Sequence, residues 1–233
     1  MNYNSSLQKW IYHRSPYFVR CATASWYGWI QRRRRYGEYF HRHLKAIEES
    51  QWFLSEELDT LQFERTKAFL TYAQLHSQFY QKLFATCGFE PESMRSLADL
   101  RKLPVINKTV VRQNLDSIMS DDLATLRVIW SHTSGTTGQG LQFPVSLESF
   151  QREYAFRFHS YSWGGAHFGG RWVFCAGHPV VPPDCTTPPF WVYDKANNWL
   201  LMSSYHLAER TMNPMINVHK WIPELAALAV SET

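Results

Sequence analysis

The stretch between residues 126 and 145 constrains the fold of this chain more than any other part of the sequence. Two short runs of strand-forming residues, 126–130 and 141–145, flank a segment at 131–140 that is rich in Ser, Thr and Gly. Such runs, bounded by small residues, predict two strands joined by a loop. Glycine lets the backbone turn sharply, and backbone N–H groups and short hydroxyl side chains donate hydrogen bonds to anions. The segment therefore predicts an anion-binding loop suited to a polyphosphate.

This loop differs from two common phosphate-binding loops. Gly135 and Gly140 have the glycine spacing of a Walker A loop, but Leu141 and Gln142 stand where that loop needs Lys and Ser or Thr. A Rossmann glycine loop opens a helix directly after a strand, whereas this segment lies between two predicted strands. We therefore expect the loop to bind phosphate through its own hydroxyl and backbone donors.

Positive charge is concentrated near the N-terminus. The chain has 24 Lys or Arg and 20 Asp or Glu among 233 residues, a net charge of +4. Residues 1–45 hold nine Lys or Arg and a single acid, Glu38, so this segment carries +8 and the remainder −4. The simpler interpretation is a solvated helical face whose arginine stems cover apolar surface, with no nucleic-acid partner. The alternative is peripheral contact with an anionic membrane through Arg32, Arg33, Arg34 and Arg35.

Cysteine usage and hydropathy favour a reducing, cytoplasmic setting. The four cysteines are widely scattered, which does not predict a disulfide framework. Cys175, His178 and Cys185 lack a second closely spaced Cys or His pair, so no metal site is expected there. No run of 18 apolar residues predicts a spanning helix, and the first 30 residues do not read as a secretory signal.

Helical periodicity dominates the first half of the chain. Apolar residues recur at three- and four-residue steps from Leu54 to Leu83, which predicts one helix over 55–86. Ser55 is the expected N-cap, and Gly88 is the expected residue after the last turn. Further helices are expected after caps at Ser96, Asn107 and Ser146, the last running to about Trp163.

The second half mixes strands with helices. The sequence predicts a buried strand over 171–175, an irregular proline-rich loop over 179–189, a hairpin of 190–193 with 199–202, and a final helix over 207–221. Together the pattern indicates the α/β class. We expect a basic, aromatic helical arm over residues 1–52, followed by a mixed α/β domain over residues 53–233.

The loop residues also carry a family resemblance. Residues Thr133, Ser134, Gly135, Thr136, Thr137 and Gly138 match the phosphate-loop signature of the adenylate-forming superfamily, which includes acyl-CoA synthetases. Upstream residues resemble the stretch before this loop in phenylacetate–CoA ligase-like proteins. Two other segments resemble the subgroup described as capsular polysaccharide biosynthesis or coenzyme F390 synthetase-like. The segments are 79–84 with 97–108 for the first resemblance, and 33–37 with 203–207 for the second.

The resemblance implies an ATP-dependent acid–thiol ligase. A carboxylic acid would attack the α-phosphate of ATP, and coenzyme A would then displace AMP to form a thioester, with Mg²⁺ offsetting the phosphate charge. By this resemblance Ser134, Thr136 and Thr137 would hold the β- and γ-phosphates, while Gly135 and Gly138 would permit close approach. His178 and His206 are weaker candidates for the acid pocket, since a lone His has many structural uses.

Two departures limit this expectation. Many members follow the loop with Pro-Lys, whereas this chain continues Gly140-Leu141-Gln142. The family's adenine-binding segment, its acidic magnesium ligand, its ribose-binding aspartate and its C-terminal lid are not recognisable after residue 143. We therefore expect an incomplete adenylate-forming domain without the lid, inactive alone. The alternatives are a non-catalytic module that binds a nucleotide phosphate, a membrane surface or a protein, or a chain completed by a separate partner chain.

Overall fold

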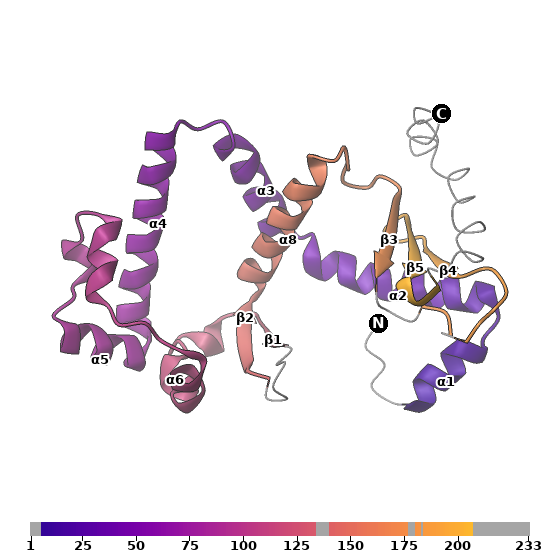
Figure 1. Ribbon diagram of the computed structural model, residues 1–233, viewed down its shortest axis with the longest axis horizontal. Coiled ribbons are helices and arrows are strands. Elements are labelled where there is room, and N and C mark those ends of the chain that lie inside the picture. The colour runs from indigo at the N-terminus through magenta and orange to yellow at the C-terminus, as the bar shows by residue number, and fades with distance from the viewer. Residues whose placement is uncertain (1–5, 134–139, 177–179, 183, 207–233) are drawn as a thin grey trace. The chain divides into compact units, whose positions relative to one another are not determined.

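The computed structural model describes residues 6–133, 140–176, 180–182 and 184–206. The chain divides into two compact units, coloured along the sequence in Figure 1. The central unit is Glu38–His159, and the terminal unit combines the chain up to Gly37 with the chain from Ser160 onward. The first elements therefore belong to the same unit as the last strands.

Three helices open the central unit: α3 (Glu38–Ser50), α4 (Ser55–His76) and α5 (Gln78–Cys87). The prediction of one helix over 55–86 was wrong, because the chain is extended at Ser77 (φ −125°, ψ 116°). The Ser77 hydroxyl accepts a hydrogen bond from the Tyr80 N–H and starts α5 as a new helix. The apolar periodicity continues across this break, which is why periodicity alone did not reveal it.

The ends of this helical pair follow ordinary capping rules. The predicted N-cap at Ser55 was wrong by one residue, since Leu54 occupies that position and its N–H donates to the Glu57 carboxylate at 2.7 Å. Gly88 adopts the left-handed conformation (φ 59°) after α5, as predicted. The two helices pack around a core of Leu70, Phe84, Phe89 and Met94, with Phe84 fully buried.

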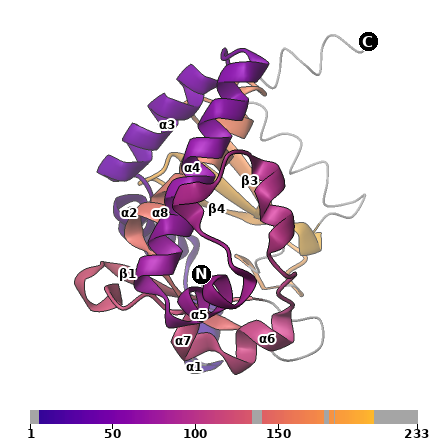
Figure 2. The same cartoon turned by 90° about the vertical axis from the view of Figure 1, so that its left-hand side faces the viewer.

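Short elements connect α5 to the hairpin. The Asp99 carboxylate accepts from the Ser96 N–H at 3.2 Å, which confirms the predicted capping box on a 3₁₀ helix. The Asn107 side chain accepts from the Val110 N–H at 3.0 Å and caps α6, also as predicted. Figure 2 shows α5 beside α7. The elements are the 3₁₀ helices Pro91–Ser93, Leu97–Lys102 and Leu123–Thr125, and the helices α6 (Lys108–Gln113) and α7 (Leu115–Ile118).

The central unit ends with the hairpin of β1 (Val128–His132) and β2 (Gln142–Ser146), followed by α8 (Leu147–Ser162). Both predicted strands and the predicted helix are confirmed, with strand bounds shifted by one or two residues. Helix α3, the first helix of the central unit, packs on α8 through the buried Phe40. The Phe40 ring contacts the Phe158 ring edge-on, with centroids 5.9 Å apart.

The terminal unit pairs two helices with a small sheet. Its helices are α1 (Ser6–Arg14) and α2 (Tyr17–Arg35), and its strands are β3 (Trp172–Ala176), β4 (Trp191–Asp194) and β5 (Trp199–Ser203). The strand order is β3-β5-β4, with β3 parallel and β4 antiparallel to β5. The predicted hairpin and strand are confirmed, but Phe174 and Cys175 are exposed, so the strand is not fully buried as predicted. The helix predicted over 207–221 lies outside the described residues.

Helix α2 covers the edge strand β4, as Figure 1 shows. Side chains of α2 satisfy backbone groups that an edge would leave unpaired. The Tyr193 N–H donates to Cys21 Sγ at 3.4 Å, and the Lys195 N–H donates to Ser25 Oγ at 2.9 Å. The Arg32 guanidinium donates to the Ala196 carbonyl at 3.0 Å. The helix is thus tied to the hairpin along much of its length.

At the centre of this contact Asp194 lies against Gly28. The Asp194 carboxylate accepts from the Ala196 and Asn197 N–H groups at 3.0 and 3.3 Å, and from the Asn197 side-chain amide at 2.7 Å. Burial raises the pKa of Asp194, and these hydrogen bonds oppose the rise. A Cβ atom at Gly28 would lie 2.1 Å from Asp194 Oδ2, so only glycine allows this approach.

These units agree with the predicted α/β class and helical N-terminal region. That the domain is of the adenylate-forming type, and that the arm ends at residue 52, stay predictions. Among the described helices, none combines the length and apolar character needed to cross a bilayer.

Candidate phosphate-binding loop

The candidate loop lies in the sequence between the two strands of a regular antiparallel hairpin. Strands β1 and β2 pair in register from Val128 opposite Ser146 to His132 opposite Gln142. The signature residues therefore begin directly after the last strand pair. The sequence prediction of two strands joined by this loop is confirmed.

Two further hydrogen bonds close the base of the loop beyond the strand pairs. The Thr133 N–H donates to the Leu141 carbonyl at 2.9 Å, and the Leu141 N–H donates to Thr133 Oγ1 at 2.9 Å. A Cβ atom at Gly140 would lie 2.7 Å from the Thr133 carbonyl oxygen, closer than real Cβ contacts come. The narrow base thus requires glycine at 140. It brings both ends of the segment 134–139 to one point.

The hairpin is anchored at its other end by α8. The Leu147 N–H donates to the Arg127 carbonyl at 2.7 Å, and Ser146 Oγ accepts from the Ser149 N–H at 3.1 Å as the predicted N-cap. The first turns of α8 are held in turn by α3, where Gln151 Oε1 accepts from the Phe40 N–H at 3.2 Å. The hairpin that flanks the loop is therefore held in place by α8.

An ion pair between α3 and α8 strengthens this anchor. Glu148 lies 2.6 Å from the Arg42 guanidinium and 3.0 Å from His43 Nε2. Partial burial works to raise the pKa of Glu148, but the His43 hydrogen bond and the charge of Arg42 outweigh it and lower that pKa. The carboxylate is about half exposed, so the pair contributes modestly to stability.

The sequence is similar to several known proteins. No family model matches the sequence. Protein CapK of Staphylococcus aureus is 26% identical over 216 residues, which are 92% of this chain and 46% of CapK. The phenylacetate-coenzyme A ligases of Thermus thermophilus and Escherichia coli are 32% identical over 88 residues and 35% identical over 86, in each case 36% of this chain and 19% of the ligase.

The chain is homologous to CapK over most of its length and to two phenylacetate-coenzyme A ligases over about a third of it. This confirms the resemblance read from the sequence. The chain spans about half the length of CapK and about a fifth of each ligase is matched.

Of the predicted phosphate loop, the structure describes Thr133, and it describes the chain again from Gly140. Thr133 is the one predicted phosphate-loop residue within the described ranges, and its hydroxyl accepts a hydrogen bond at the base of the loop. Ser134, Gly135, Thr136, Thr137 and Gly138 lie outside them. Their roles stay predictions.

Of the two histidines predicted to line the acid pocket, the structure describes His206. His178 lies outside the described residues. His206 is 4% exposed in the terminal unit, where its ring stacks on Phe190 at 5.1 Å and its Nε2 lies 3.0 Å from the Pro182 carbonyl oxygen. This packing fixes the ring in the core of the unit. A pocket role for His206 stays a prediction.

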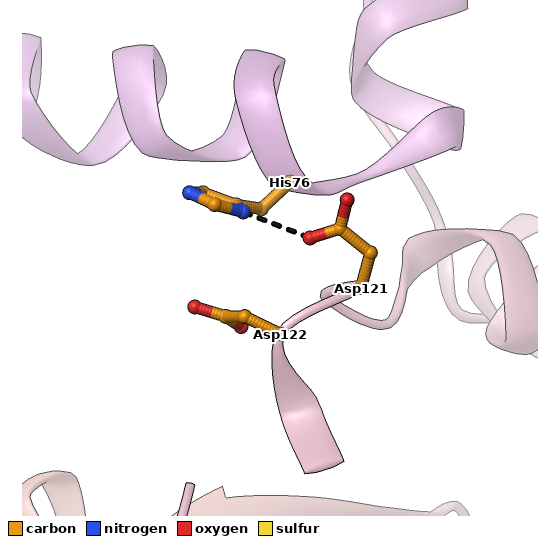
Figure 3. Close-up of side chains that lie close together, drawn as sticks. All are labelled: His76, Asp121 and Asp122. Carbon is orange, nitrogen blue, oxygen red and sulfur yellow. Dashed lines mark hydrogen bonds and ion pairs between the residues drawn. The ribbon is translucent and has the colours of Figure 1, made fainter. Parts of the chain in front are cut away.

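Sequence reasoning missed one cluster of ionisable side chains, His76, Asp121 and Asp122 (Figure 3). One potential metal-ligating atom from each lies within 4.8 Å of the others. His76 ends α4 and the two acids follow α7 some 45 residues later, so no local motif in the sequence joins them.

The contacts of this cluster connect the end of α4 to the loop after α7, and we call this set of hydrogen bonds the latch. His76 Nδ1 lies 2.8 Å from Asp121 Oδ1, and the Asp121 N–H donates to the His76 carbonyl at 2.9 Å. The Tyr72 hydroxyl donates to Asp122 Oδ1 at 2.8 Å, and Ser120 bonds the same oxygen. These bonds, that from Ser120 foremost, lower the pKa of Asp122. Because these side chains hydrogen-bond to one another and to their neighbours at an exposed helix end, we assign the cluster the structural role of holding α4 to this loop.

Proposed function

We propose that residues 133–138 form the nucleotide-phosphate loop of an ATP-dependent acid–thiol ligase. The observation that carries this proposal is the hairpin, which closes its base at Thr133 and Leu141 and presents a segment of Ser, Thr and Gly between two anchored strands. The proposal is supported by the related proteins, of which two are phenylacetate-coenzyme A ligases.

In the proposed reaction, a carboxylate oxygen attacks the α-phosphorus of ATP and the bond to the bridging oxygen breaks. The products are an acyl-adenylate and pyrophosphate. The thiolate of coenzyme A then attacks the acyl carbon, and AMP leaves as the thioester forms. Ser134, Thr136 and Thr137 donate hydrogen bonds to the β- and γ-phosphate oxygens and stabilise the charge that develops on the leaving pyrophosphate. These hydroxyls position the phosphates and transfer no proton.

The donor set suits a polyphosphate better than a metal ion. Residues 133–140 supply hydroxyl and backbone N–H groups but contain no Asp or Glu. When bound, Mg²⁺ neutralises phosphate charge and prefers carboxylate and phosphate oxygens as ligands. The loop would therefore meet Mg²⁺ through the phosphates. His178 and His206 remain the proposed candidates for the pocket of the carboxylic acid.

Because the chain spans about half the length of CapK, we propose phosphate binding for this stretch and both chemical steps for the complete protein. The alternatives are a separate partner chain that supplies the remainder, and a module that binds a nucleotide phosphate without catalysis.

Equilibrium binding of Mg·ATP to the 233-residue chain tests the proposal. Thr136→Val removes one hydroxyl at nearly constant volume, and its matched control is Thr60→Val on the exposed side of α4. A hydrogen bond to a charged group contributes about 1.5–3 kcal/mol, so Thr136→Val should weaken binding roughly 10- to 150-fold. The control should bind as the wild type does.

Exchange of labelled pyrophosphate into ATP, with a panel of aryl and fatty acids, separates the two functions. We expect no exchange from the 233 residues alone and acid-dependent exchange from the complete protein. Binding without exchange in the complete protein favours the non-catalytic module. No binding of Mg·ATP, or equal binding by both variants, contradicts the phosphate loop.

A further inference from the structure

Helix α2 has two unlike faces. One face packs on the β4 hairpin and buries Ala24 and Gly28. The other carries large apolar side chains that lie exposed, although helices of soluble proteins usually keep such residues inside. Their spacing along the helix places them on one side of it, in what we call the exposed stripe. They are Phe18 (72% exposed), Trp26 (65%), Trp29 and Ile30.

Arginine is built into this stripe. The rings of Trp26 and Trp29 stack with centroids 5.4 Å apart, and the Arg33 guanidinium lies 4.0 Å over the Trp29 ring. Arg33 is itself exposed at the end of the stripe. A guanidinium over an indole face keeps its charge while covering apolar surface. The stripe therefore combines an apolar centre with a cationic edge.

The neighbouring helix α1 repeats this pattern. Trp10 and Ile11 are exposed, and the Arg14 guanidinium lies 4.4 Å over the Trp10 ring. Two helices of the same unit thus carry exposed indoles with stacked arginines.

The charge of this segment has one sign. Residues 1–37 contain seven Lys or Arg and no Asp or Glu. A protein surface that normally stays in water mixes both signs, whereas an unbroken positive segment with exposed tryptophans suits a negatively charged, partly apolar partner.

Arg32 and Arg33 lie in different environments, so they differ in their ability to contact a partner. Arg32 is engaged within the unit, where it donates to the Ala196 carbonyl and lies 5.3 Å over the Phe168 ring. Arg33 faces the exposed side with Trp29. The run of four arginines is therefore not one uniform contact surface.

We propose that the exposed stripe of α2, Phe18, Trp26, Trp29, Ile30 and Arg33, binds an anionic lipid surface. The indoles sit at the level of the headgroups, where tryptophan is favoured, and Arg33 pairs with lipid phosphate. A bilayer surface offers apolar chains beneath an anionic layer, which matches an apolar stripe with a cationic edge. This site lies in the terminal unit and is independent of the phosphate loop.

Cosedimentation of the 233-residue chain with vesicles tests the proposal. Vesicles of phosphatidylcholine with added phosphatidylglycerol should bind the chain, and vesicles of phosphatidylcholine alone should bind it far less. High salt should weaken binding to the anionic vesicles, because exposed charges are screened. Each basic residue near an anionic surface contributes about 1 kcal/mol, so Arg33→Glu should weaken binding more than about fivefold.

Matched variants separate this site from general effects of charge and hydrophobicity. Trp26→Ala with Trp29→Ala should reduce vesicle binding about tenfold or more, from the apolar surface lost. Trp52→Ala removes an indole that is 81% exposed in the central unit, and Arg65→Glu makes the same charge change there. Both controls should bind vesicles as the wild type does. Circular dichroism spectra should match throughout, since every altered side chain is exposed.

Several results would overturn the proposal. Equal binding to neutral and anionic vesicles would remove the charge argument. If Trp52→Ala and Arg65→Glu reduced vesicle binding as much as the α2 variants do, the stripe would not be the binding site. Binding to an RNA oligonucleotide, or a dimer that depends on Trp26, without vesicle binding would assign the stripe to a different partner.

Discussion

The contact between Gly28 and Asp194 makes an unusual prediction about helix α2. Gly28 lies inside this helix, where alanine is ordinarily about 1 kcal/mol better than glycine. In Gly28→Ala, however, the new Cβ would lie 2.1 Å from Asp194 Oδ2 and 2.5 Å from Cγ. The Asp194 carboxylate, or the helix, must move.

The expected cost exceeds the gain in helix propensity. Overpacking typically costs about 1–3 kcal/mol. Moving the carboxylate also sacrifices at least one of its charge-assisted hydrogen bonds to Ala196 and Asn197, at about 1.5–3 kcal/mol each. After the propensity gain of about 1 kcal/mol, Gly28→Ala should lower the free energy of unfolding by about 1.5–5 kcal/mol.

Hydrogen exchange with urea titration is the suitable assay, because the chain has two units that need not unfold together. Amides of α2 and of the β4–β5 hairpin should lose protection in Gly28→Ala. Thr23→Ala, on the exposed side of the same helix, should change stability by less than about 0.5 kcal/mol. In an Asp194→Ala background, Gly28→Ala should become neutral or stabilising. Stabilisation in the wild-type background would refute the contact.

Three further predictions concern the central unit. Gly140→Ala should open the base of the candidate loop at Thr133, which weakens Mg·ATP binding while circular dichroism stays unchanged. The pKa of Asp99 is lowered to about 2 by Lys102 and by the backbone N–H groups it accepts from, so its contribution to stability is present above the unfolded-state pKa and is lost as pH falls through about 2. Carboxyl NMR titration should find this midpoint, and Lys102→Gln should raise it. Asp122→Asn should increase hydrogen exchange at the end of α4, whereas unchanged exchange there would contradict the latch.

The elements that local chemistry determines could be predicted from the sequence. The hairpin at 128–146 follows from strand-forming runs around a small-residue segment, and the caps at Asn107 and Ser146 follow from side chains that accept backbone N–H groups. The resemblance to ligase-like proteins likewise rests on short stretches, such as residues 133–138. These signals lie within a few residues of each other along the chain.

Features that depend on distant contacts could not be predicted. The helix breaks at Ser77 although the apolar periodicity continues across this residue, and the Ser77 hydroxyl donates to the Ser117 carbonyl, 40 residues away. The Gly28–Asp194 approach and the His76–Asp121 pair join residues that no local pattern relates. The exposed side of α2 shows the same limit, because the sequence identifies an aromatic, basic helix but not which side packs on β4.

The central claim is that residues 133–138 bind the phosphates of ATP. Hydrogen exchange of the 233-residue chain, followed in the proteolytic peptide that covers this segment and measured with ATP and with AMP in the presence of Mg²⁺, tests it most directly. The proposed loop holds the β- and γ-phosphates, so its amides should be protected by ATP and not by AMP. Equal protection by both nucleotides, or none by ATP, would contradict the claim.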